Sequence, residues 1–304
     1  MLFWLAQPTA GEYTRLLNSA SQLIRENRLD AAIRELTRAA AMEPRSAMAH
    51  LLLGQAYLGK GTAELVAQAK AEFQQSKELD SGQALPSFYI AKIDLDLGRI
   101  SQAERELQQA LEKRPGEHYL LALLGEVRRQ QGRIEEAIEL TTKAIATGPE
   151  ALPVHYYRAL AWWDRKDEIR ALEDLQRVLD SPFPTVDAFL AAGAIHLHHN
   201  RLAQAEASFR KAVELGPDRA EPRLRLAQVM RRQRRFDLAL KELSRVESAP
   251  HLSSHYFQKL LADAACEEGL IRLDQGDPAR AKASFQRALE IDPSHQEAMS
   301  RLRP

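Results

Sequence analysis

The side chains of this chain that could bind a metal or react are a histidine run and one cysteine. His196 and His199 lie within the run 195–200, three residues apart, so on a helix they share a face and could supply two metal ligands. No carboxylate or cysteine is spaced to provide a third ligand. We therefore expect His196 to pack like an aromatic residue, His198 and His199 to be solvated, and the chain to hold no metal or cofactor. Cys266 is the single cysteine, so it cannot form an internal disulfide.

Sequence motifs for catalysis are missing. There is no phosphate-binding glycine loop, no nucleophile elbow, no HExxH and no CxxC. Acidic and basic residues are plentiful, but they fall where helix surfaces need charge. We therefore predict that the protein is not an enzyme.

The densest run of charge covers residues 231–235 and is reinforced by Arg223 and Arg225. It could anchor an acidic peptide, a phosphate or RNA, but cations are also favourable at the carboxyl end of a helix. The chain has 42 basic and 42 acidic residues, whereas nucleic-acid and anionic-membrane binders need a sustained basic field. We expect a solvated helix end and no nucleic-acid partner. No apolar run approaches the length of a membrane span.

These residues are carried by a repeat with a period of 34 residues. The segments 97–117 and 131–150 match at that spacing, as in the pairs Gly98 and Gly132, and Pro115 and Pro149. Alanines mark the repeat along the chain, with steps of 34 except for the first, which is 37, and the last, which is 42: Ala32, Ala69, Ala103, Ala137, Ala171, Ala205, Ala239 and Ala281. The unit therefore occurs eight times, with a short insertion near 60–66 and a longer one near 251–261. A fixed period of this length is typical of stacked repeat proteins.

Each unit has the pattern of two short amphipathic helices joined by a tight turn. A small residue precedes each marker alanine and would let the two helices approach closely: Ala20, Gly54, Ala91, Gly125, Ala159, Gly193, Ala227 and Gly269. Six turns carry a residue that tolerates the left-handed conformation: Asn27, Gly61, Gly98, Gly132, Asn200 and Gly276. Lys166 and Arg234 depart from this rule in the other two turns. Such helix pairs cannot bury their apolar faces alone, so neighbouring pairs must stack.

The pattern resembles the tetratricopeptide repeat over residues 12–295. The best matches are 186–217, with Phe189, Gly193, Ala205, Phe209, Ala212 and Pro217, and 262–293, with Gly269, Ala281, Phe285, Ala288 and Pro293. The resemblance implies an all-α fold, a right-handed α-solenoid (superhelix) of antiparallel helix pairs. We divide the chain into an apolar N-terminal segment 1–11, eight repeats over 12–293, and a C-terminal capping helix over 294–304.

The resemblance also implies that the first helix of each unit lines a concave groove that binds a peptide or a partner protein. The predicted groove residues are three aromatics of repeats three to five, one further aromatic of repeat five, and two cations that would orient partner carboxylates: Phe88, Tyr119, Tyr156, Trp163, Lys92 and Arg129. Some of these aromatics could instead pack between adjacent first helices. The family variant that clamps a chaperone's C-terminal carboxylate uses Lys and Asn at places that hold Leu17 and Ser21 here, so a co-chaperone role is not expected.

We therefore expect a non-enzymatic scaffold for protein–protein interaction. The alternatives are an exported or envelope-associated adaptor for assembly of a pilus, outer membrane or polysaccharide, and the recognition subunit of a separate glycosyltransferase. The high Ala and Arg content is typical of a GC-rich bacterial gene. The apolar start, Met1 to Pro8, has no basic region before it and is expected to cap the first repeat, although it could be the remnant of an export signal. A cytoplasmic location is favoured over a periplasmic or secreted one.

Overall fold

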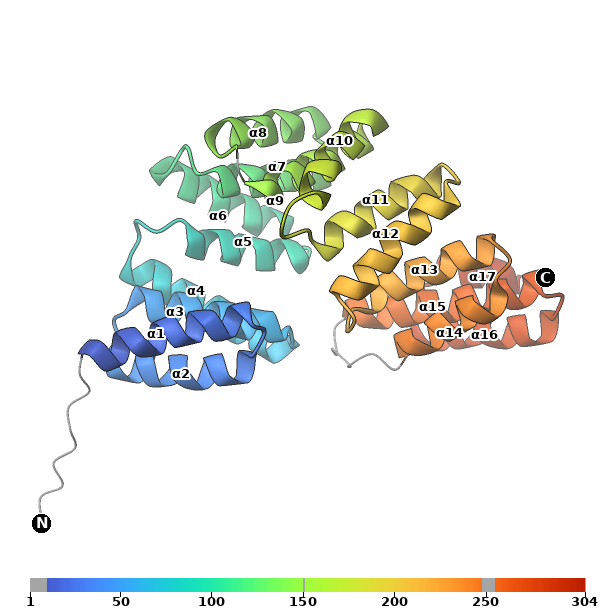
Figure 1. Ribbon diagram of the computed structural model, residues 1–304, viewed down its shortest axis with the longest axis horizontal. Coiled ribbons are helices and arrows are strands. Elements are labelled where there is room, and N and C mark those ends of the chain that lie inside the picture. Colours follow the sequence, from blue (N-terminus) through green and yellow to red (C-terminus); the bar gives the residue numbers. More distant parts are fainter. Residues whose placement is uncertain (1–9, 150, 248–254, 304) are drawn as a thin grey trace, which may run out of the picture. The chain divides into compact units, whose positions relative to one another are not determined.

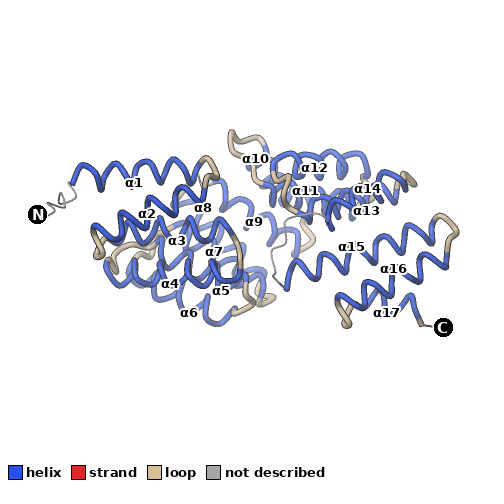
Figure 2. The backbone as a smooth tube through the Cα atoms, turned by 90° about the horizontal axis from the view of Figure 1, so that it is seen from below, coloured by secondary structure: helices blue, strands red, loops and turns tan. Residues whose placement is uncertain are grey.

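A computed structural model describes residues 10–149, 151–247 and 255–303. Over these residues the chain forms seventeen α-helices and no strand (Figures 1 and 2). The first sixteen helices form eight consecutive pairs, which confirms the all-α solenoid of eight helix pairs. The predicted N-terminal segment lies almost entirely outside the described residues, as does the first part of the second insertion. Among the described helices, none is long and apolar enough to cross a membrane.

The chain forms two compact units, Met1–Tyr157 and Arg158–Pro304. The helices of the first unit are α1 (Ala10–Arg25), α2 (Leu29–Met42), α3 (Ala47–Lys60), α4 (Ala63–Leu79), α5 (Leu85–Asp96), α6 (Ile100–Lys113), α7 (His118–Gln130) and α8 (Ile134–Thr147). The division falls within α9 (Leu152–Asp164). The second unit continues with α10 (Glu168–Leu179), α11 (Val186–His198), α12 (Leu202–Leu215), α13 (Ala220–Arg232), α14 (Phe236–Glu247), α15 (His255–Asp274), α16 (Pro278–Ile291) and α17 (Gln296–Leu302).

All eight turns within helix pairs contain a residue with positive φ. The glycines and asparagines identified in the sequence take this conformation, with φ between 55° at Asn200 and 80° at Gly276. Lys166 (φ 70°) and Arg234 (φ 61°) take it as well, although their side chains make it less favourable. The helix pairing is therefore strong enough to impose the same turn on residues that do not prefer it.

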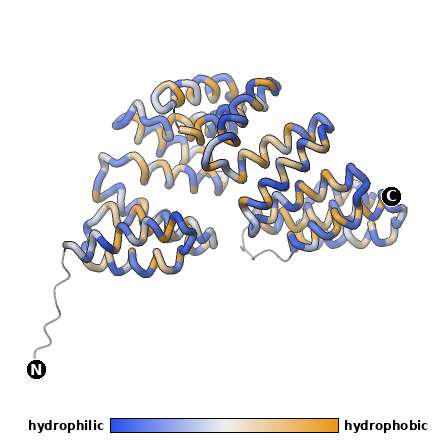
Figure 3. The backbone as a smooth tube through the Cα atoms, in the orientation of Figure 1, coloured by the Kyte–Doolittle hydropathy of each residue, from blue (hydrophilic) through white to orange (hydrophobic). Residues whose placement is uncertain are grey.

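In the core of each repeat, one residue of the first helix and one of the second helix have complementary sizes. Where the first helix carries glycine, the facing residue is usually phenylalanine: a Cβ placed on Gly193 would lie 2.5 Å from the ring of Phe209. Gly54 with Phe73 and Gly269 with Phe285 repeat this arrangement. Where the first helix carries alanine, the corresponding residue of the second helix is leucine, and all four leucines are buried: Leu36, Leu107, Leu175 and Leu243. Hydrophobic residues accordingly recur at intervals along the helices (Figure 3).

Polar contacts also join one repeat to the next. Glu206 of α12 accepts hydrogen bonds from Gln233 (2.9 Å) and Arg235 (2.9 Å) of the following repeat, and from Arg210 (2.7 Å). Burial alone would raise the pKa of Glu206, but these hydrogen bonds outweigh it and lower the pKa from 4.5 to about 2. In the first unit Glu104 accepts from Gln131 at 2.6 Å, the counterpart of the Gln233 contact, and also from Arg128.

The last helix, α17, packs on α16. Ala298 is fully buried and joins the apolar cluster that contains Phe285 and Ala288, with Leu302 packed against it. His295 caps the helix through Nδ1, which accepts from the N–H of Ala298 at 3.2 Å, and its Nε2 lies 3.0 Å from Asp263 of α15. The apolar end of the second unit is thereby covered.

Candidate functional site

The predicted groove residues of the first unit come from its first helices: Phe88 and Lys92 from α5, Tyr119 and Arg129 from α7, and Tyr156 from α9. We call the residues Met48, Gln55, Leu85, Phe88, Lys92, Tyr119 and Arg129, from α3, α5 and α7, the first-helix stripe. Two of its large apolar side chains are exposed, Met48 to 45% and Leu85 to 39%. Gln55 donates a hydrogen bond to the hydroxyl of Tyr89 at 2.9 Å, which ties α3 to α5. The stripe thus presents apolar side chains on a fixed framework.

Phe88 and Tyr119 contact each other between α5 and α7. Their ring centroids are 5.6 Å apart and the rings are almost perpendicular, an edge-to-face arrangement that stabilises aromatic pairs. Both side chains are half-buried. Burial, together with the nearby carboxylate of Glu117, raises the pKa of Tyr119 to about 12. The two rings therefore both support the helix packing and leave part of their surface accessible.

The two predicted orienting cations already have acidic partners. The carboxylate of Glu126, which is 6% exposed, accepts from Arg129 Nε and Nη2, each at 2.7 Å. Lys92 lies 3.5 Å from Asp96, and both of these side chains are largely exposed. Because Glu126 is buried, its carboxylate must be neutralised, and Arg129 supplies the charge. Lys92 is the more available of the two cations.

Tyr156 and Trp163 lie seven residues apart on α9, at the two sides of the division between the units. Tyr156 packs against Tyr157, with ring centroids 5.5 Å apart. In the second unit Trp163 meets the edges of His198 (5.2 Å) and His199 (6.0 Å) from the end of α11. Trp163 is therefore part of the contact between repeats five and six and only half-buried there.

The histidine run shows one contact that the sequence did not reveal. His199 Nε2 lies 2.8 Å from a carboxylate oxygen of Glu168, which also pairs with Arg201, so His199 is exposed but not simply solvated. His196 is half-buried, and its Nδ1 has no hydrogen-bond partner among the described residues. Burial, and to a lesser extent the charge of His199, lowers the pKa of His196. Within the described part of the chain, no group of three or more His, Cys, Asp or Glu residues could hold a metal ion.

The arginine run is a solvated helix end only in part: Arg232 and Arg234 are exposed, but Arg231 and Arg235 are half-buried and paired. Arg231 Nε donates to buried Glu267 at 2.5 Å, and its Nη1 donates to Asp274 at 3.0 Å. Arg232 donates to the carbonyl of Leu197 at 3.1 Å. With Arg235 bound to Glu206, most of the run joins repeat seven to its neighbours. The sequence feature that could have predicted this pairing lies one repeat further along the chain, where the acidic residues Glu267 and Asp274 face Arg231.

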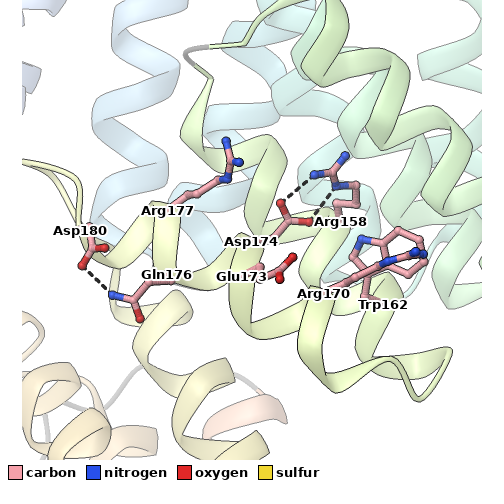
Figure 4. Close-up of a pocket in the computed structure, with 8 residues that line it drawn as sticks. All are labelled: Arg158, Trp162, Arg170, Glu173, Asp174, Gln176, Arg177 and Asp180. Carbon is pink, nitrogen blue, oxygen red and sulfur yellow. Dashed lines mark hydrogen bonds and ion pairs between the residues drawn. The ribbon is translucent and has the colours of Figure 1, made fainter.

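A polar cavity of about 540 Å³ lies beside α9 and α10 in the second unit (Figure 4). Arg158 makes two hydrogen bonds to Asp174, at 2.7 and 2.8 Å, and the guanidinium of Arg170 lies 4.6 Å from the ring centre of Trp162. The lining has three arginines and three acidic residues. This balance gives the cavity no preference for a ligand of one charge, so we do not assign it a ligand.

Comparison with known proteins agrees with the repeat architecture. Residues 17–84 and 90–151 match a family model for the tetratricopeptide repeat, and residues 154–303 match one for a tetratricopeptide repeat-like domain. Tetratricopeptide repeat protein 8 of Caenorhabditis elegans is 23% identical over 222 residues, which are 70% of this chain and 41% of that protein. The chain therefore spans less than half the length of this relative.

Two solved structures show the same fold. The Cut9–Hcn1 hetero-tetramer of the APC/C gives a TM-score of 0.70 at 16% identity, covering 94% of this chain and 54% of that chain. A tetratricopeptide repeat protein from Parabacteroides merdae gives 0.52 at 16% identity, covering 96% and 98% of the two chains. With two matching family models that together span most of its length, this chain belongs to the tetratricopeptide repeat family.

Proposed function

We propose that the protein is a non-catalytic scaffold that binds an extended peptide or a helix of a partner protein on the first-helix stripe. Family and fold support the general role, because tetratricopeptide repeats are typically interaction scaffolds. The observation that carries the choice of surface is that Met48 of α3 and Leu85 of α5, at the same position of successive repeats, are exposed, while Phe88 and Tyr119 contact each other between α5 and α7. Exposed apolar surface is a common mark of a protein-interaction site.

The chemistry of the stripe favours apolar recognition. Phe88 and Tyr119 hold each other in place, so a ligand that packs against them loses little additional side-chain entropy. Arg129 is committed to Glu126, and the exposed pair of Lys92 with Asp96 is of a kind that contributes little energy. We therefore assign the binding energy mainly to the apolar and aromatic side chains, with Lys92 contributing to orientation.

The distance between successive repeats sets the interval between the ligand residues that can contact them. Packed helices lie about 8–10 Å apart, and an extended chain advances about 3.3 Å per residue, so anchors from successive repeats would contact every third ligand residue. A bound helix, which rises 1.5 Å per residue, would offer side chains about seven residues apart. The expected ligand is thus an apolar segment with one of these two periods. Tyr156 in the first unit and Trp163 in the second are two further predicted anchors, each considered within its own unit.

Capture from a lysate of the source organism tests the proposal. Met48→Ser with Leu85→Ser should abolish capture of the partner, because both side chains are exposed and their removal leaves the core intact. Leu97→Ser is the matched control, because Leu97 is equally apolar, 52% exposed and outside the stripe. Tyr156→Ala and Trp163→Ala test these two further anchors. A partner that is retained by the Met48/Leu85 variant would move the binding surface away from the stripe.

A further inference from the structure

His50 of α3 lies between two hydrogen-bond acceptors. Its Nδ1 is 2.6 Å from a carboxylate oxygen of Glu72 of α4, and its Nε2 is 3.1 Å from the carbonyl oxygen of Pro44, in the linker between α2 and α3. A neutral imidazole has one N–H and one lone pair and can donate to one acceptor, whereas an imidazolium donates from both nitrogens. The two hydrogen bonds of His50 therefore form together only when the ring is charged.

Repeat seven makes the same contact with a residue whose charge is fixed. Arg223 of α13 stands at the place of His50, four residues before the small residue of its repeat. Its Nη1 donates to Glu242 of α14 at 3.1 Å, and its Nη2 donates to the carbonyl of Pro217 at 3.1 Å. These are the acceptors that His50 has in repeat two, a carboxylate of the second helix and the proline carbonyl of the preceding linker. Because a guanidinium is always charged, the shared geometry is one that suits a cation.

His295 has the surroundings that a neutral histidine needs. Its Nδ1 accepts from the N–H of Ala298 at 3.2 Å, while its Nε2 lies 3.0 Å from a carboxylate oxygen of Asp263. One donor and one acceptor satisfy a ring with a single proton. Among the described residues, both polar contacts of the His50 ring are with acceptors. The need for a second proton thus belongs to the surroundings of His50 and not to histidine in this fold.

The elements packed against α3 bring several charged and titratable side chains near this contact: Glu72 of α4, Glu43 and Arg45 of the linker, Glu12 and Tyr13 of α1, and Arg38 of α2. Arg38 pairs with Glu12 at 3.1 Å, so their charges compensate each other. Glu43 and Arg45 are exposed and of opposite charge, and solvent screens them. The hydroxyl of Tyr13 bonds to Ser46 of the linker. The carboxylate of Glu72 is therefore the main charge that acts on His50.

We propose that His50 is a proton-dependent latch at the joint between repeats one and two. While the ring carries both protons, it ties α4 and the linker 43–46 to the start of α3. A histidine ring loses its second proton as the pH rises through neutral values. The remaining N–H then stays with the charged acceptor Glu72, which forms the stronger hydrogen bond, and the lone pair of Nε2 faces the carbonyl of Pro44. The linker contact is lost on the alkaline side, whereas the Arg223 contact of repeat seven persists.

Hydrogen exchange of the whole chain at about pH 6 and about pH 8.5 measures the latch. The rates, corrected for the pH dependence of unprotected amides, are compared for the segments 43–50 and 216–223, which hold the two equivalent contacts. At the higher pH we expect the protection of 43–50 to fall about tenfold relative to 216–223, the effect of losing one hydrogen bond to a charged group. A ratio that is the same at both pH values would overturn the proposal.

Exchanging the two residues assigns the effect. His50→Arg places the fixed cation of repeat seven at the joint and should keep 43–50 protected at both pH values. The reciprocal variant Arg223→His should make the protection of 216–223 depend on pH. A pH dependence of 43–50 that survives His50→Arg would belong to another group and would overturn the proposal. Neither residue is part of the first-helix stripe, so these results do not depend on partner binding.

Discussion

Exchanging the Gly193–Phe209 pair for the alanine–leucine pair of the next repeat tests the packing rule of the core. The Cβ of Gly193→Ala would lie 2.5, 2.7 and 2.8 Å from three carbons of the Phe209 ring, which is fully buried and cannot move into solvent. Such overpacking costs about 1–3 kcal/mol, and removing a glycine from a helix interior returns about 1 kcal/mol. The single variant should therefore lose about 1 kcal/mol of unfolding free energy.

Phe209→Leu alone should also destabilise, by about 1–2 kcal/mol, because it leaves a cavity above Gly193. In the double variant the alanine methyl group occupies that space, as at Ala227 and Leu243. We therefore expect the double variant to lose about 1–3 kcal/mol less unfolding free energy than the sum of the two single losses.

Urea denaturation followed by circular dichroism measures the four members of this cycle. Hydrogen exchange in α11 gives a local reading, since a repeat array need not unfold as one unit. The matched control combines Gly193→Ala with Phe285→Leu, two repeats away, where the effects should add to within about 0.5 kcal/mol. If the free-energy losses of Gly193→Ala and Phe209→Leu also add, the complementary sizes of these two residues do not govern the packing, and the reasoning is refuted.

Three further predictions concern single residues of the second unit. The lowered pKa of Glu206 contributes stability that is complete above its ordinary value of 4.5 and is lost as the pH falls toward 2. Glu206→Gln should therefore remove up to about 3 kcal/mol of acid-dependent unfolding free energy, measured by urea denaturation at pH values between 2 and 4.5. An unchanged pH profile of stability would contradict this. Arg231→Ala strands the buried carboxylate of Glu267 and should cost about 3–5 kcal/mol in unfolding free energy, whereas a loss below 1 kcal/mol would show that the pair is not structural. Arg234→Gly relieves a left-handed turn and should raise stability by about 1 kcal/mol, measured by thermal denaturation; a decrease would mean that the arginine is not strained there.

The repeat architecture was predictable because periodicity depends on residue type alone. Marker alanines at intervals of 34 and the small residues that face them predict the helix pairs, and the described residues form eight such pairs in order. Arg234 was harder to predict, since its left-handed turn is imposed by the neighbouring helices and not by its own preference.

The charges of the candidate surface were less predictable, because pairing depends on burial and on side-chain direction. The repeat pattern predicted Arg129 as a groove cation, but it could not show that Glu126 is buried and takes Arg129 as its partner. The boundary between the two compact units falls within α9, where the 34-residue period of the sequence does not change, so the period could not predict it.

The central claim is that a partner protein lies on the first-helix stripe, and site-specific photo-crosslinking tests it most directly. A photoreactive amino acid at position 85, where Leu85 is 39% exposed, is compared with one at position 97, where Leu97 is 52% exposed and outside the stripe. The account predicts a covalent adduct with a partner protein at position 85 and none at position 97. An adduct at position 97 alone, or equal adducts at both positions, would contradict it.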